Sequence, residues 1–247
     1  LARAVEKLGY RVILAEGAEK ILGRRSPNRL YRPVGCGGLK LLLRNYRLSD
    51  DVAFRFSERK WVEYPLTAAK YAHWLHRVGR EETVINLFMD YETFGEHQWA
   101  ETGIFTFLRE LPREVLRNPD FSFRTPAEVA DAHDAVDEID IPGFISWADE
   151  ERDMTAWLGN AMQQDAARKV YEMEPAIRRQ NDETLLRKWR SLQTSDHFYY
   201  MCTKWFADGD VHRYFNPFDS PYEAYINYMN ILDDLGKSIT TNKGEAS

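Results

Sequence analysis

The sequence has 247 residues, of which 44% are hydrophobic and 29% are charged, and its net charge of −6 argues against a nucleic-acid partner, because it repels a phosphate backbone. The mean hydropathy is −0.55 and no apolar run approaches the ~20 residues that a membrane-spanning helix needs, so we expect no membrane association. The given residues contain no signal-peptide pattern, and the sequence leaves an upstream export signal open. Cys36 and Cys202 have no spacing typical of zinc or disulfide frameworks, which favours a reducing compartment such as the cytoplasm.

The first 140 residues alternate predicted strands and helices. A helix over residues 2–8 ends at Gly9, and Arg11 to Ala15 form a short apolar strand of the kind that is buried in parallel sheets. Thr125 to Glu128 form a capping box that opens a later helix. The elements between them are a loop over 23–38, a strand over 52–57, a helix over 66–78, a strand over 83–89, a helix over 103–116 and a short strand over 121–123.

The pattern becomes nearly all helical after Asp140, where Ile141-Pro142-Gly143 marks a boundary. Apolar residues follow a helical stripe over 154–162, a second helix covers 184–206, and a capping box at Ser220 to Glu223 opens a helix through Leu235. The predicted domains are therefore an α/β part over 1–140, a helical subdomain over 141–240 and a disordered tail over 241–247.

Acidic side chains follow two of the predicted strands. Glu16 follows the strand over 11–15, and Asp90 follows the strand over 83–89. Ligands bind at the carboxyl ends of parallel strands, and a pair of carboxylates at such ends is what glycoside hydrolysis requires. The same acids also suit helix caps or loop salt bridges, and the spacing alone leaves both readings open.

Three motifs resemble those of glycoside hydrolase family 57, in the order of that family. They are LAEGAE over 14–19, FMDYETFGEHQW over 88–99, and SWADEERD over 146–153 with WLGN over 157–160. The α-amylase and α-amylase-like subgroup is the most similar. The family's first two motifs have no counterpart here, so the resemblance covers the C-terminal portion of the catalytic region.

The resemblance implies the C-terminal strands of a (β/α)7 barrel followed by a helical bundle. It implies double displacement on α-1,4-glucans or maltooligosaccharides without a metal or cofactor, with Glu16 as nucleophile and Asp90 as general acid/base. Glu19 is the alternative nucleophile. The sequence does not separate hydrolysis from glucan transfer, and it leaves the chain length of the substrate and the oligomeric state open.

Five further residues are candidates for substrate binding. His97 and Trp99 lie on the loop after Asp90, where loop packing is an equal alternative, and Trp147 is suited to stacking on sugar. Asp149 suits either sugar hydroxyls or a helix cap. Arg55 lies near the end of the predicted strand over 52–57, where it either holds a carboxylate in its ionised state or forms a surface pair.

Two other functions remain open. One is a non-catalytic, carbohydrate-binding relative, because the α-amylase-like subgroup includes members that have lost a catalytic residue. The other is an inactive fragment that lacks the N-terminal half of the barrel, which would leave a strand edge unpaired.

Overall fold

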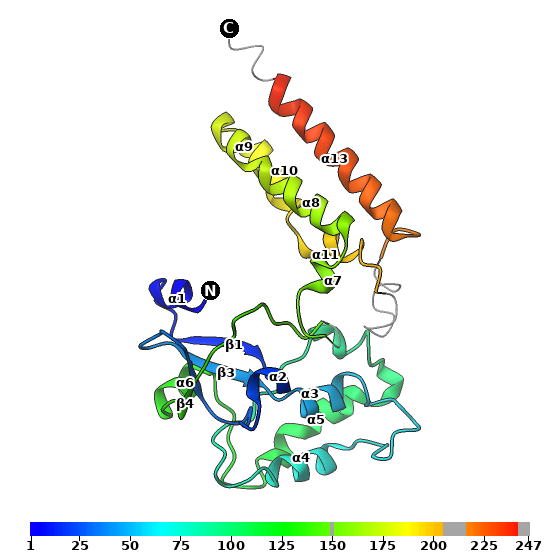
Figure 1. Cartoon of the computed structure of the whole chain (residues 1–247). Coiled ribbons are helices and arrows are strands. Elements are labelled where there is room, and N and C mark those ends of the chain that lie inside the picture. The colour runs from blue at the N-terminus through cyan, green and yellow to red at the C-terminus, as the bar shows by residue number, and fades with distance from the viewer. Residues whose placement is uncertain (149–150, 205–215, 242–247) are drawn as a thin grey trace. The chain divides into compact units, whose positions relative to one another are not determined.

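The computed structural model describes residues 1–148, 151–204 and 216–241 (Figure 1). The chain divides into two compact units, Leu1–Pro142 and Gly143–Ser247. The first unit contains α1 (Ala2–Lys7), β1 (Val12–Glu16), α2 (Glu19–Leu22), β2 (Tyr31–Pro33), β3 (Lys40–Arg44), α3 (Tyr46–Ala53), α4 (Ala68–His76), the 3-10 helices η1 (Tyr91–Thr93) and η2 (Ala100–Thr102), α5 (Ile104–Val115), α6 (Pro126–Ala132) and β4 (Asp137–Ile139).

The first unit is built around a small four-stranded sheet in the order β1-β3-β2-β4. β1 and β3 are parallel and pair over their full length, from Val12 opposite Lys40 to Glu16 opposite Arg44. β2 is antiparallel to β3 and parallel to β4. Because side chains alternate along a strand, Ile13 and Ala15 pack on one face, and Val12 packs with Leu42 on the other. The α/β character is thereby confirmed.

Helices α3, α4 and α5 enclose a separate aromatic core. Tyr71 of α4 is fully buried and its ring lies 5.7 Å from that of Phe107 of α5, in an edge-to-face arrangement. Figure 1 shows α4 and α5 side by side, as their many mutual contacts require. The burial of these aromatic rings adds buried apolar surface, which stabilises the unit beyond what the four short strands contribute.

The predicted strand over residues 52–57 is wrong. Residues 46–53 form α3, because the side chain of Asn45 caps the helix by accepting a hydrogen bond from the Leu48 amide at 3.2 Å. Val52, Ala53 and Phe56 are buried, and this spacing is helical rather than alternating.

The segment over 83–89 is extended but pairs with no strand of the sheet. Its hydrogen bonds come from both backbone and side chains: the Asn45 amide donates to the Asn86 carbonyl at 2.9 Å, Asn86 Nδ2 donates to the Leu43 carbonyl at 3.0 Å, and the Phe88 amide donates to Ser49 Oγ at 3.2 Å. Its predicted alternation is nevertheless present, since Val84 and Phe88 pack beside the sheet while Ile85, Leu87 and Met89 pack against the helical core. The short strand predicted over 121–123 is not formed either.

The second unit is helical over its described residues. Its elements are α7 (Thr155–Leu158), α8 (Ala161–Glu172), α9 (Glu174–Gln180), α10 (Glu183–Ser191), α11 (Ser195–Tyr199) and α13 (Pro221–Thr241). Figure 1 shows α13 alongside α8, and the two share one core with α10, in which Trp189 Nε1 donates to the Val170 carbonyl at 2.7 Å. Trp157 and Tyr200 pack against that core.

Two helical predictions in this unit need correction. The helix predicted over 184–206 is divided into α10 and α11, because Thr194 and its neighbours favour a turn: Thr194 Oγ1 donates to the Ser191 carbonyl at 2.9 Å. Residues 205–206 lie outside the described part. α13 extends to Thr241, and residues 242–247 of the predicted tail are also outside it.

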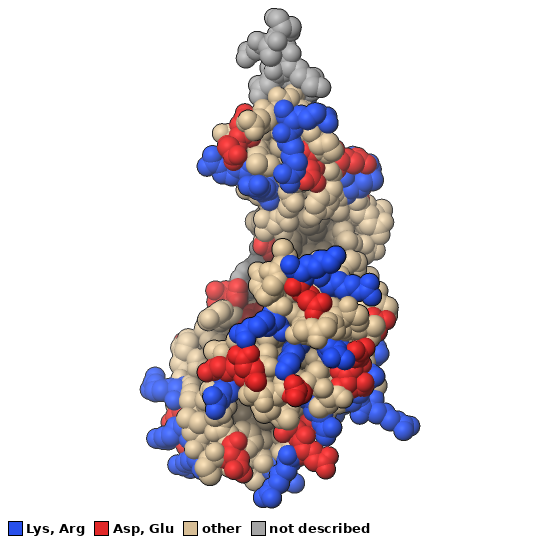
Figure 2. All heavy atoms as spheres, turned by 90° about the vertical axis from the view of Figure 1, so that its left-hand side faces the viewer, with Lys and Arg blue, Asp and Glu red and all other residues tan. Residues whose placement is uncertain are grey.

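Surface charges of opposite sign are interspersed on the face shown in Figure 2. Many form local pairs, such as Arg32 with Glu138 at 2.7 Å and Arg25 with Asp137 at 2.9 Å. Cys36 and Cys202 are both buried. Throughout the described ranges, every helix is too short or too polar to cross a bilayer.

Candidate active site

Glu16 is the last residue of β1, and its side chain is completely shielded from solvent. Directly opposite in the parallel register lies Arg44, the last residue of β3, whose Nη1 is 3.1 Å from Glu16 Oε2. An adjacent guanidinium stabilises the ionised form of a carboxyl group. The carboxyl ends of two neighbouring strands therefore form a buried ion pair.

Arg44 is a candidate site residue that was not predicted from the sequence. Besides Glu16 it contacts Asp50 of α3, with Nη2 to Oδ1 at 2.6 Å, and its Nε donates to the Phe88 carbonyl at 2.7 Å. The apolar run Leu41 to Leu43, bounded by glycines and Asn45, is the signal that predicts β3 and places Arg44 at a strand end just as Glu16 is placed.

Gly17 makes the close approach of the two strand ends possible. A Cβ atom built on Gly17 would clash with the backbone carbonyl oxygen of Arg44 and press on Pro27. Glycine follows the candidate nucleophile here because no side chain fits between the ends of β1 and β3.

Asp90 ends the extended segment over 83–90 and is exposed to solvent. Two residues earlier, both backbone groups of Phe88 are held, the amide by Ser49 Oγ and the carbonyl by Arg44 Nε. The segment is thus fastened beside the carboxyl end of β3, and Asp90 continues from that point.

Two buried residues, Thr93 and Gln98, hold the loop that follows Asp90. Gln98 Nε2 donates to the Ala53 carbonyl at 2.9 Å. The amide of His97 donates to the Glu92 carbonyl at 2.9 Å, while Trp99 is 55% exposed. The loop therefore holds its fold through a few buried contacts and presents Trp99 outwards.

Arg55 does not lie at a strand end, because the expected strand over 52–57 is replaced by α3 and the turn that follows it. Its Nη1 pairs with Asp51 of that helix, and its guanidinium lies 6.0 Å from the ring centroid of Trp61. The arginine that holds a strand-end carboxylate is Arg44.

Glu19, the alternative nucleophile, begins α2 and has a side chain that is 65% exposed. It accepts a hydrogen bond from the hydroxyl of Tyr46 at 2.8 Å and also pairs with Arg47. The hydrogen bonds that Arg47 donates to Tyr46 and Glu19 raise the pKa of its guanidinium above the usual value.

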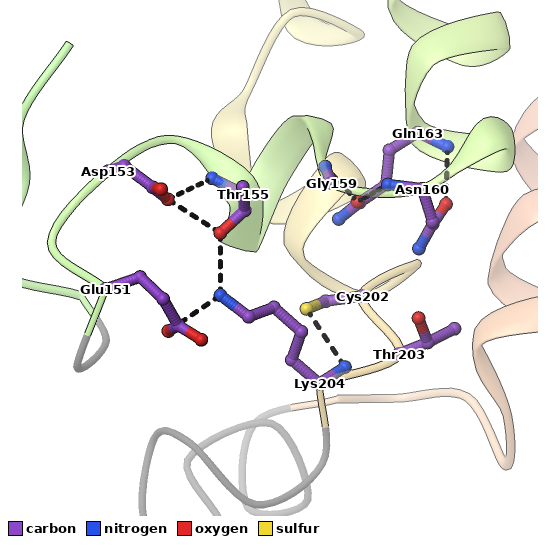
Figure 3. A pocket seen from close by; sticks show the side chains of 9 residues that line it. All are labelled: Glu151, Asp153, Thr155, Gly159, Asn160, Gln163, Cys202, Thr203 and Lys204. Atoms are coloured by element: carbon purple, nitrogen blue, oxygen red, sulfur yellow. Dashed lines mark hydrogen bonds and ion pairs between the residues drawn. The ribbon is translucent and has the colours of Figure 1, made fainter. Parts of the chain in front are cut away.

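In the second unit, the motif that begins at Ser146 leads into a polar pocket of about 290 Å³ (Figure 3). The ammonium of Lys204 bridges Glu151 Oε2 at 2.8 Å and Thr155 Oγ1 at 2.6 Å, and the Lys204 contact lowers the pKa of Glu151. Trp147 is 41% exposed, whereas Asp149 lies outside the described residues. Pocket-lining residues also include Asn160 and Gln163, which complete a second capping box.

Among the residues that the structure describes, no group of three or more His, Cys, Asp or Glu side chains is gathered as a metal site requires. Of the two candidate carboxylates, that of Glu16 is buried beside the Arg44 guanidinium and that of Asp90 is exposed.

Comparison with known proteins gives this arrangement a family. Residues 1–142 match the model described as glycosyl hydrolase family 57. A Methanocaldococcus jannaschii protein named "Putative alpha-amylase" is 48% identical over 245 residues, which cover 95% of this chain and 52% of that protein. The chain thus spans about half the length of that relative.

The fold is similar to that of a family 57 branching enzyme from the hyperthermophilic archaeon Thermococcus kodakaraensis, whose crystal structure is a complex with glucose and additives. The TM-score is 0.59 at 17% identity, and the match covers 81% of this chain and 48% of the other. Because the family model matches more than half of its residues, the chain belongs to glycosyl hydrolase family 57.

Proposed function

We propose that this chain carries both catalytic carboxylates of a retaining hydrolase acting on α-1,4-glucans, with Glu16 as nucleophile and Asp90 as general acid/base. The observation that carries the proposal is that Glu16 ends β1 beside Arg44, while the segment leading to Asp90 is hydrogen-bonded to that same arginine. Glu16 and the segment that leads to Asp90 thereby meet at Arg44, the last residue of β3, and ligands of parallel α/β folds bind at such strand ends.

In this mechanism, Glu16 attacks the anomeric carbon as Asp90 protonates the leaving glycosidic oxygen. Asp90 then takes a proton from water, which attacks the glycosyl-enzyme and releases Glu16. The Arg44 guanidinium favours the ionised, nucleophilic form of the Glu16 carboxylate. The exposure of Asp90 gives it access to both the leaving group and water.

The substrate proposal draws on the relatives, one named as an α-amylase and the other a branching enzyme crystallised with glucose. Trp99, on the loop after Asp90, offers an exposed aromatic face, and His97 a ring nitrogen; Trp147, Asp149 and Arg55 remain candidates for sugar contacts. We further propose that the four-stranded sheet is the C-terminal part of a (β/α)7 barrel.

Turnover of maltoheptaose by three variants tests the assignment. It is measured on the complete natural polypeptide, because this chain spans about half of its relative. We expect Glu16→Gln and Asp90→Asn to lower kcat at least about 1,000-fold, since each removes a group that bonds to reacting atoms. Glu19→Gln is the matched control and retains activity. Wild-type rates in the first two variants would refute the proposal.

The burial of Glu16 favours a second candidate function. A carboxylate with 0% side-chain exposure must be uncovered before it meets a sugar, and the Glu16–Arg44–Asp50 cluster also suits a purely structural role. The protein would then be a carbohydrate-binding relative without turnover. Isothermal titration with maltoheptaose separates the two: binding with no released sugar supports this candidate, and turnover abolished by Glu16→Gln excludes it.

A further inference from the structure

We propose that Arg44 is a positioning residue that fixes the nucleophile and the acid/base relative to each other; this inference rests on the proposed catalytic roles of Glu16 and Asp90. Each guanidinium nitrogen of Arg44 contacts a different segment. Nη1 contacts β1 at Glu16, Nη2 contacts α3 at Asp50, and Nε contacts the extended segment at Phe88.

The burial of this cluster makes its geometry rigid. The side chains of Arg44 and Asp50 are 3% and 13% exposed, and that of Glu16 is fully buried. Charge-assisted hydrogen bonds are strong when water is excluded, and a planar fork with three engaged nitrogens has little rotational freedom left. A lysine ammonium has the same charge but lacks that fork.

The connection reaches Asp90 through the backbone. Phe88 is held on both sides, by Arg44 at its carbonyl and by Ser49 at its amide, and Ser49 itself is fully buried. Beyond Asp90, the buried side chain of Gln98 is hydrogen-bonded to Ala53, the last residue of α3. Asp90 therefore lies between two residues with fixed positions, Phe88 and Gln98. Phe88 is hydrogen-bonded to β3 and α3, and Gln98 is hydrogen-bonded to α3.

Asp50 has a defined part in this arrangement. Two carboxylates share one guanidinium, so Asp50 directs Nη2 away from Glu16 and leaves Nη1 to contact it. Asp50→Asn removes the negative charge that holds Nη2 of Arg44 and keeps the size and shape of the side chain.

Kinetics of the complete natural polypeptide on maltoheptaose test the proposal. A displacement of about 1 Å at a reacting group costs on the order of 100-fold in rate, so we expect Arg44→Lys to lower kcat about 100-fold with KM within threefold of wild type. Asp50→Asn and Ser49→Ala release one contact each, and we expect a kcat lowered about three- to tenfold at unchanged KM. Arg11→Lys, in an exposed pair with Asp131, and Ser122→Ala, on the surface, are the controls.

The fraction of folded protein is measured for each variant, so that kcat refers to folded molecules. If Arg44→Lys does not fold, Ser49→Ala and Asp50→Asn decide the question. Wild-type kcat in the folded variants would overturn the positioning role while leaving the catalytic assignment intact, because that assignment depends on Glu16→Gln and Asp90→Asn. A wild-type protein without turnover would overturn both.

Discussion

Gly17 is the residue on which the geometry of the strand ends depends most directly. Replacement by alanine places a methyl group against the Arg44 carbonyl oxygen, so either β1 or β3 must shift. Overpacking of this kind costs about 1–3 kcal/mol, and we expect Gly17→Ala to lower the free energy of unfolding by that amount, measured by urea denaturation. Gly79→Ala, at a site with open space around it, is the control; equal stability of the two variants would contradict the account.

For single residues, the rule that ligands bind where parallel strands end places Glu16 correctly at the end of β1, whereas Asp90 follows a segment that forms no strand, so that the family motif alone indicates it. It missed Arg44 because the apolar run Leu41 to Leu43 was not assigned to a strand. For Arg55 the sequence left two roles open, holding a strand-end carboxylate or forming a surface pair, and in the structure Arg55 pairs with Asp51 of α3. The catalytic roles of all these residues stay predictions.

Among the elements, α8 and α13 are joined by a contact that depends on pH. The hydroxyl of Tyr225 donates to Asp165 Oδ2 at 2.7 Å, and this bond, with Lys169 and Arg168 nearby, lowers the pKa of Asp165 from 3.8 to about 2. A carboxyl whose pKa is lowered by folding stabilises the protein above its unfolded pKa, and the stabilisation is lost as the pH falls through the folded value.

We therefore expect Asp165→Asn to be less stable than wild type at pH 6, with a difference that shrinks between pH 4 and pH 2. Thermal denaturation over that range measures it. Asp233→Asn, which removes an exposed i,i+4 partner of Lys237 on α13, is the control. A stability difference that stays constant with pH would show that Asp165 does not act through its ionisation.

Elements with strong local signals were predictable, and those that depend on partners were not. The capping box at Thr125 is present, with the Thr125 amide 2.7 Å from Glu128 Oε2, because it needs only neighbours in sequence. The segment over 83–89 has the alternation of a strand, yet it forms no strand: the Phe88 amide donates to Ser49 Oγ, and the Asn86 carbonyl accepts from the Asn45 amide. The short strands β2 and β4 depend on pairing with distant segments, β2 with both β3 and β4, and β4 with β2.

For the whole molecule, composition and the change of pattern near Asp140 predicted an α/β part followed by a helical part, and the compact units are Leu1–Pro142 and Gly143–Ser247. The first unit holds three of the buried clusters and the second holds one. A complete barrel could not be derived, because closure depends on strand pairings that this sequence does not specify.

The most direct test of the central claim is covalent trapping of the nucleophile. A 5-fluoro-maltosyl fluoride loses fluoride as the nucleophile bonds to its anomeric carbon, and the ring fluorine slows hydrolysis of the ester. Trypsin cleaves after Arg11 and Lys20, so the peptide Val12–Lys20 contains both Glu16 and Glu19. The account predicts that tandem mass spectrometry finds the sugar on Glu16. A label on Glu19, or turnover with no label in this peptide, would contradict it.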